Sequence, residues 1–206
     1  MKKLITLTLA VVMLLTVSAA SAKTMAPDND GYEDLPGIVV NATVGEYNEV
    51  MKTFKVTLYT DDSFEVEDVE KLAVGDLMIA GGQLFTVKEK AEDENGEIMV
   101  TAEDGAEIVF IQVGDDHMMA QSTDDDRRYM HAFAVLYLPA AEGIVYEDNS
   151  DPEKEEAVVT KGLEEILKIK AEKEETSIGF DYYATLIELN DRMEIVRIHQ
   201  DYDVAQ

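Results

Sequence analysis

The segment between residues 115 and 126 is the part of the sequence whose side chains best suit a chemical role. It holds two groups of acids, Asp115 with Asp116 and Asp124 with Asp125 and Asp126. Ca²⁺ binds roughly six to eight oxygen atoms, many of them from carboxylates. No loop of the chain has the acid, glycine and glutamate spacing of an EF-hand. The segment therefore predicts either an irregular calcium site or an acidic loop in contact with solvent.

A second group of candidate ligands lies partly inside this segment and partly just after it. It combines imidazole with thioether side chains, a pairing that suits copper and especially Cu(I). The alternative is structural, because methionine commonly fills gaps in cores and a core histidine is often bound to a backbone group. The residues are His117, Met118, Met119, Met130 and His131.

Tyrosines near the C-terminus are candidates for a recognition surface. Tyr182, Tyr183 and Tyr202 fall in or beside the last predicted hairpin. Tyrosine is favoured at interfaces because it offers apolar area together with a polar tip. Strands also favour tyrosine, so the alternative is that these residues simply line the core or the sheet surface.

Composition and missing motifs exclude several classes of chemistry. The 206 residues contain no cysteine, so disulfides, zinc–thiolate sites, iron–sulfur clusters and cysteine nucleophiles are impossible. The net charge of -27 repels nucleic acid and anionic membranes. The sequence lacks G-x-S-x-G, H-E-x-x-H, the P-loop and G-x-G-x-x-G. We predict no catalytic set and no cofactor apart from a possible Ca²⁺, and a carboxylate-dependent hydrolase stays open as an alternative.

Residues 1–22 have the pattern of a cleaved signal peptide. Lys2 and Lys3 precede an apolar run from Leu4 to Val17, and 20–22 reads Ala-Ser-Ala. The run is too short to span a bilayer comfortably, so we expect no stable membrane anchor after cleavage. Removing the peptide leaves 15 basic against 44 acidic residues, a charge of -29. We therefore predict export from a bacterial cell to the periplasm, the envelope or the exterior.

The rest of the chain must position these side chains, and its pattern is mostly that of strands. Residues 23–36 predict a flexible acidic leader, and residues 37–147 an antiparallel β domain. Gly81-Gly82, Asn95-Gly96 and Asp104-Gly105 are turn signals about ten residues apart. They predict a meander that forms a small barrel or sandwich. The apolar stretch 129–138 predicts a central strand, and 115–128 a long loop.

The composition changes near residue 148, and residues 148–206 predict a helix followed by a β-hairpin. An apolar stripe with helical spacing indicates a helix over about 152–172, which Gly162 could interrupt. This element stands apart or packs on the β domain as one unit. The fold class is therefore mainly β (α+β).

Taken together, these features predict an exported, non-catalytic binding or interaction module. Its partner would be a ligand or protein outside the cytoplasm, with no role for nucleic acid. The alternatives are the secreted carboxylate-dependent hydrolase and an acidic Ca²⁺-binding protein.

Overall fold

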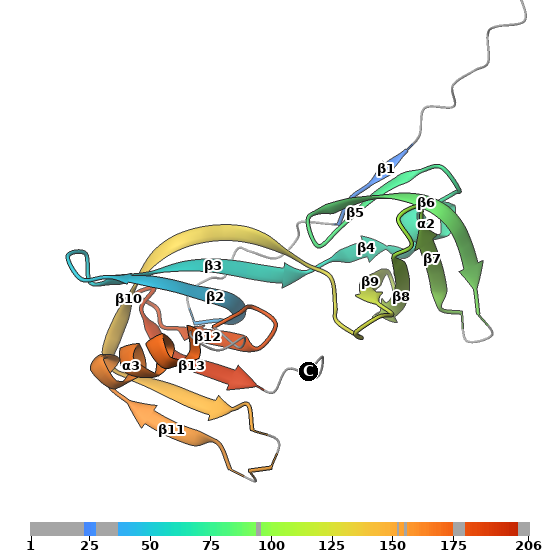
Figure 1. The fold of residues 1–206 in the computed structure, drawn as a ribbon. Coiled ribbons are helices and arrows are strands. Elements are labelled where there is room, and N and C mark those ends of the chain that lie inside the picture. The colour runs from blue at the N-terminus through green and yellow to red at the C-terminus, as the bar shows by residue number, and fades with distance from the viewer. Residues whose placement is uncertain are drawn as a thin grey trace, which may run out of the picture.

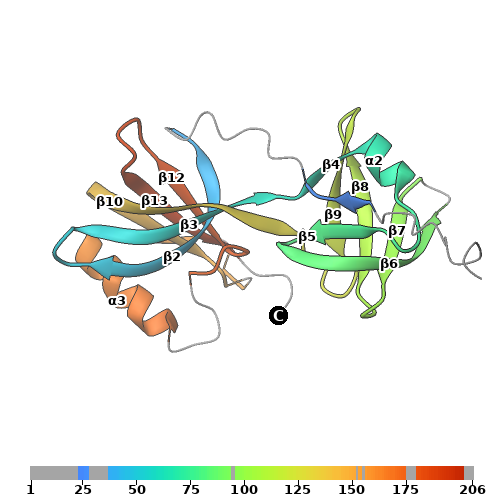
Figure 2. The ribbon, with the colours of Figure 1, turned by 90° about the horizontal axis from the view of Figure 1, so that it is seen from above.

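The computed structural model describes residues 23–27, 37–93, 96–151, 153–154, 156–174 and 180–201. Over these residues the chain is mainly β with two helices, one of them short, so the predicted fold class is confirmed. The strands form two curled sheets, each with its own cluster of buried apolar side chains. Figures 1 and 2 show two lobes side by side. We call them the meander lobe (β1, β4–β9 and the short helix α2, Val66–Lys71) and the helix lobe (β2, β3, β10–β13 and α3).

The meander lobe is a seven-stranded sheet in the order β1-β5-β6-β7-β8-β9-β4. From β5 to β9 each strand pairs antiparallel with the next in the chain, and up to β8 this is what the turn signals predicted. Gly81 and Gly105 have φ of 58° and 95°, backbone conformations that glycine adopts without strain. The strands are β1 (Thr24–Met25), β4 (Ser63–Glu65), β5 (Leu77–Ala80), β6 (Gln83–Glu92), β7 (Ile98–Ala102), β8 (Glu107–Val113) and β9 (His117–Ser122).

Two strands of this lobe differ from the sequence-based prediction. β9 lies inside the predicted loop 115–128, because it pairs with β8 on one side and β4 on the other. β1 lies inside the predicted flexible leader, where it pairs parallel with β5 and buries Met25. The remaining leader residues 28–36 and the predicted signal peptide 1–22 lie outside the described residues.

The helix lobe is a six-stranded sheet in the order β11-β10-β13-β12-β2-β3, and β10 also pairs with β3. β10 (Met130–Asn149) changes partner along its length. Its first half pairs antiparallel with β3, and its second half, from Ala140, pairs parallel with β13. The sheet therefore curls back on itself. Its other strands are β2 (Val39–Asn48), β3 (Thr53–Asp61), β11 (Val158–Lys161), β12 (Thr185–Leu189) and β13 (Ile195–Asp201).

Helix α3 (Leu163–Glu174) lies along one side of the helix lobe and belongs to that lobe alone (Figures 1 and 2). Ile166 is fully buried and belongs to the apolar core of this lobe. The predicted helix over 152–172 is wrong in its first half. Gly162 has a φ of 93°, which a helix excludes, and the residues before it form β11 against β10.

The sheets divide the chain differently from the boundary predicted at residue 148. β12 and β13 come after that boundary, yet they pair with β2 and β10, which begin before it. The meander lobe in turn lies between β3 and β10 along the chain, apart from β1. Within the described residues, no helix is long and apolar enough to cross a membrane.

Asp62 lies where the chain passes from the helix lobe into the meander lobe, and it is completely buried. Its carboxylate accepts a hydrogen bond from the Gly81 backbone N–H at 2.5 Å. The other carboxylate oxygen lies 2.6 Å from Nδ1 of His131. Since Gly81 belongs to the meander lobe and His131 to β10, one buried side chain joins the two lobes.

Candidate functional site

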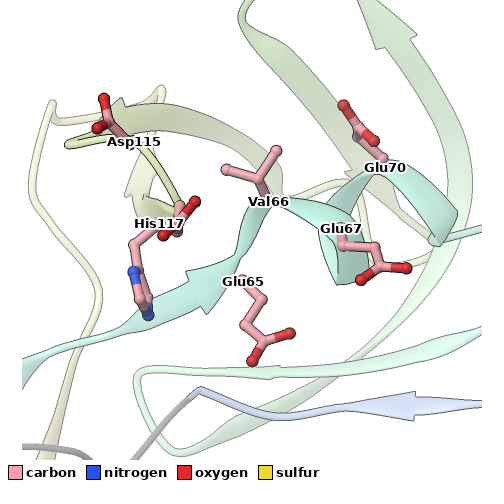
Figure 3. Close-up of a pocket in the computed structure, with 7 residues that line it drawn as sticks. Glu65, Val66, Glu67, Glu70, Asp115 and His117 are labelled. Atoms are coloured by element: carbon pink, nitrogen blue, oxygen red, sulfur yellow. The ribbon is translucent and has the colours of Figure 1, made fainter.

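A pocket of about 460 Å³ opens on the meander lobe, where β4, α2 and the turn between β8 and β9 meet (Figure 3). Its lining is strongly acidic. Apart from one valine and one histidine, every residue around it carries a carboxylate. The lining residues are Glu65, Val66, Glu67, Glu70, Asp115, Asp116 and His117.

Strand pairing brings the two sides of this pocket together. β4 and β9 pair antiparallel, with Glu65 opposite His117. The Val66 backbone N–H, at the start of α2, donates to the Asp116 carbonyl oxygen at 2.9 Å. Gly114 takes a φ of 78° in the intervening turn. The β8–β9 turn is therefore held against the first turn of α2.

Helix α2 (Val66–Lys71) supplies the opposite wall. Val69 is its buried residue, so its acidic side chains point outward. Nζ of Lys90 donates to the carbonyl oxygens of Val69 and Glu70, at 2.7 Å and 2.6 Å. Burial in this position lowers the pKa of Lys90. These two bonds fix the end of a helix that is too short to be stable alone.

The carboxylates surround the pocket and do not converge on one point. In Figure 3 the side chains of Glu65, Glu67, Glu70 and Asp115 point in different directions. Across the described part of the chain, no three His, Asp or Glu side chains are grouped so that they could hold a metal ion. Glu67 is paired with Lys71, and its hydrogen bond raises the pKa of that lysine. The pocket thus presents negative charge spread over its rim.

The structure separates the five aspartates that the sequence grouped. Asp115 and Asp116 precede β9 and line the pocket, whereas Asp124 to Asp126 follow that strand. The six residues of β9 span about 17 Å at roughly 3.4 Å per residue. The second group forms a turn in which Asp125 Oδ2 lies 3.7 Å from Nε of Arg127. The two groups therefore face different surroundings.

The five predicted soft-metal ligands are also distributed over different surroundings. His117 lines the acidic pocket, and the next residue, Met118, is buried in the core of the meander lobe. Met119 is half-buried on β9 opposite Ser63. Met130 is buried, and His131 contacts the carboxylate of Asp62.

The predicted tyrosine surface is half-buried and makes contacts within the chain. Tyr182 stacks on Tyr59 with ring centroids 3.9 Å apart, and it contacts Tyr183 at 4.1 Å. The guanidinium of Arg127 lies 4.6 Å from the ring centre of Tyr183. We call this set the aromatic ladder. It connects the segment after β9 to the helix lobe. Tyr202 lies outside the described residues.

A smaller pocket of about 240 Å³ lies on the helix lobe beside Arg197 and His199. Its charged groups are already paired with one another. Arg197 contacts Glu147 at 2.6 Å and Glu188 at 3.2 Å. His199 lies 2.9 Å from Asp201. Both carboxylates of the lining contact the guanidinium of Arg197, so this pocket offers a ligand less unpaired charge than the acidic one.

Sequence reasoning located half of the acidic pocket and missed the other half. Asp115, Asp116 and His117 were candidates, whereas Glu65, Glu67 and Glu70 were not. The helical spacing of Val66 and Val69 was the available signal, because it leaves acids on the exposed side of α2. That these acids lie beside the β8–β9 turn depends on the pairing of β4 with β9, which local pattern does not encode.

Comparison with known proteins gave no relative: no family model, no curated protein and no solved structure matches this chain.

Proposed function

We propose that this protein is an exported, non-catalytic binding protein, and that its acidic pocket takes an extended cationic partner such as a Lys- or Arg-rich peptide segment. The observation that carries the proposal is the pocket beside α2, with five carboxylates around about 460 Å³. Export rests on the signal-peptide pattern of residues 1–22.

The arrangement of the carboxylates favours an extended ligand over a single ion. A divalent cation needs several oxygens at one point, at about 2.3 to 2.6 Å for Ca²⁺. Glu65, Glu70 and Asp115 point apart instead, on different elements. A chain of lysines or arginines carries its charges several ångströms apart, so it can meet such carboxylates one by one.

The charge of the whole chain supports the same class of partner. The formal net charge is -27, so the field around the molecule attracts cations and repels anions. The pocket concentrates that field, because its walls place five acids around one hollow. Attraction of this kind accelerates association and weakens as salt concentration rises.

The test is calorimetric titration of the mature protein with hexalysine. It is done at low salt and in 0.15 M NaCl, where the Debye length is about 8 Å. We expect the triple variant Glu65→Gln, Glu70→Gln, Asp115→Asn to bind about tenfold more weakly. Three exposed ion pairs at about 0.5 kcal/mol each add up to that factor.

The matched control neutralises three exposed acids elsewhere: Glu142→Gln, Glu156→Gln and Asp191→Asn. This control removes the same net charge. If the pocket is the binding site, the control variant binds hexalysine as tightly as the unaltered protein. Equal weakening in both triple variants would show general charge attraction and overturn the pocket. Tight binding of Ca²⁺ that the pocket variant abolishes would favour the ion-binding alternative instead.

A further inference from the structure

The first described residue is fixed to the meander lobe by its backbone nitrogen. The N–H of Lys23 donates to Oδ1 of Asp76 at 3.0 Å. The Lys23 carbonyl oxygen accepts the Leu77 N–H at 2.8 Å, and Thr24 and Met25 continue as β1 beside β5. Met25 is 3% exposed and belongs to the core of the lobe. The position of the Lys23 nitrogen is therefore determined by the packing of Met25, two residues further along the chain.

Asp76 is held ready for this contact by the surrounding backbone. Its Oδ2 accepts the Ala73 N–H at 3.0 Å, and its own N–H donates to the Ala73 carbonyl oxygen at 3.0 Å. Its carbonyl oxygen accepts the Val87 N–H at 2.9 Å. One oxygen of the half-buried carboxylate is thus held by the Ala73 N–H, and the other oxygen is directed at the Lys23 nitrogen.

The same nitrogen is the one that signal-peptide cleavage would release. The Ala-Ser-Ala pattern ends at Ala22, so a signal peptidase would hydrolyse the bond between Ala22 and Lys23. Water adds across that bond: the new carboxylate leaves with the signal peptide, and the Lys23 nitrogen becomes an amine that takes up a proton.

We propose that Asp76 is a binding site for the α-ammonium group of Lys23 in the processed protein, so that cleavage after Ala22 turns an amide hydrogen bond into an ion pair and stabilises the meander lobe. This inference rests on the export part of the proposed function and is independent of the peptide-binding part.

Asp76 faces this nitrogen directly and favours its ammonium form. The positive charge of Nζ on the same lysine is compensated separately, by Asp68 on α2 at 2.5 Å. That contact lowers the pKa of Asp68, to which Lys71 also contributes. In the precursor a neutral amide donates to the Asp76 carboxylate, a bond in which only the acceptor is charged. After cleavage the donor is also charged, so the Coulomb attraction between ammonium and carboxylate adds to the hydrogen bond.

The first measurement is the intact mass of the exported protein, which must correspond to a chain that begins at Lys23. The second is the melting temperature of two purified chains at pH 7, residues 23–206 and residues 22–206, each with and without Asp76→Asn. We expect Asp76→Asn to lower the melting temperature by about 3 °C in the first chain and by about 1 °C or less in the second. Asn keeps the turn to Ala73, so the fold is retained.

Asp104→Asn is the matched control. Its carboxylate also accepts a backbone N–H in a turn of the same lobe, from Ala106 at 3.1 Å, but it is remote from the N-terminus along the chain. We expect it to act equally on both chains. NMR titration of the α-amine gives an independent measurement, with a pKa above the ordinary value of about 8. That pKa falls back in Asp76→Asn.

The outcomes separate the proposals. A mass that places cleavage elsewhere overturns the signal-peptide assignment and this inference with it. Cleavage after Ala22 with equal effects of Asp76→Asn in both chains, or an unshifted α-amine, overturns the ion pair alone. Failure of hexalysine to bind overturns the proposed ligand and leaves the N-terminal result unaffected.

Discussion

At the scale of single residues, Asp61 and Asp62 show that neighbouring side chains of one type can have opposite roles. Asp61 is partly exposed and contacts Arg128 at 3.2 Å, a surface pair of the kind that contributes little to stability. Asp62 has no exposed surface and is bound by Gly81 and His131. A buried carboxylate is tolerated only when hydrogen bonds replace its lost water. Local pattern does not reveal which of two adjacent aspartates is buried.

We expect Asp62→Ala to lower the free energy of unfolding by about 3–5 kcal/mol, since it leaves the Gly81 N–H and the His131 ring without their buried acceptor. Urea denaturation followed by circular dichroism measures this. Asp61→Ala is the neighbouring control, with an expected cost below about 1 kcal/mol. Similar costs for the two variants would contradict the role given to Asp62.

At the scale of elements, local pattern predicted the parts of the fold that are made locally. The meander was predictable because each hairpin carries its own turn signal, as at Gly81 and Gly105. β9 was not, since aspartates flank this short strand on both sides and its pairing with β4, a strand more than fifty residues earlier, does not show in local pattern. β10 was predicted only in part, because its length depends on exchanging β3 for β13 as partner. Half of the acidic pocket was missed for the same reason: its two walls meet through long-range pairing.

Gly162 decides where α3 begins. Its φ of 93° separates β11 from the helix, and its N–H donates to the Ile144 carbonyl oxygen at 2.9 Å. We expect Gly162→Ala to cost about 1–2 kcal/mol of stability, because an L-residue is strained in a left-handed conformation. Thermal unfolding measures the cost, and Lys161→Ala on the exposed end of β11 is the control. A stable variant with a stronger helical signal would mean that the helix had extended backward instead.

At the scale of the whole molecule, the described contacts between the lobes are few and specific. The chain crosses between them three times: between β1 and β2, at Asp62, and in the residues before β10 (Figure 1). Beside these crossings, the aromatic ladder places Arg127 over Tyr183. The Tyr182 hydroxyl is desolvated there, which raises its pKa. We infer that the relative position of the lobes depends on this small set of contacts.

A double-mutant cycle between Arg127→Ala and Tyr183→Ala tests the ladder. We expect a coupling energy of about 0.5–1 kcal/mol, the usual range for a cation over an aromatic ring at a partly exposed site. Chemical denaturation of the four proteins gives the value. Pairing Arg127→Ala with Tyr137→Ala, an exposed tyrosine on β10, is the control cycle and should give additive changes. If the changes are additive in both cycles, Arg127 and Tyr183 are not energetically coupled, and the aromatic ladder does not link the lobes.

The insertion of the meander lobe between β3 and β10 also sets an order of folding. Val56 pairs with Leu136, although most of the meander lobe separates them along the chain. Closing so long a loop in an unfolded chain is entropically costly and slow. The meander hairpins close over a few residues each, and their completion brings Asp61 next to Met130, the first pair of the β3–β10 ladder. We therefore expect the inserted lobe to acquire hydrogen-exchange protection first in refolding, and the lobe that contains the C-terminal strands to complete afterwards.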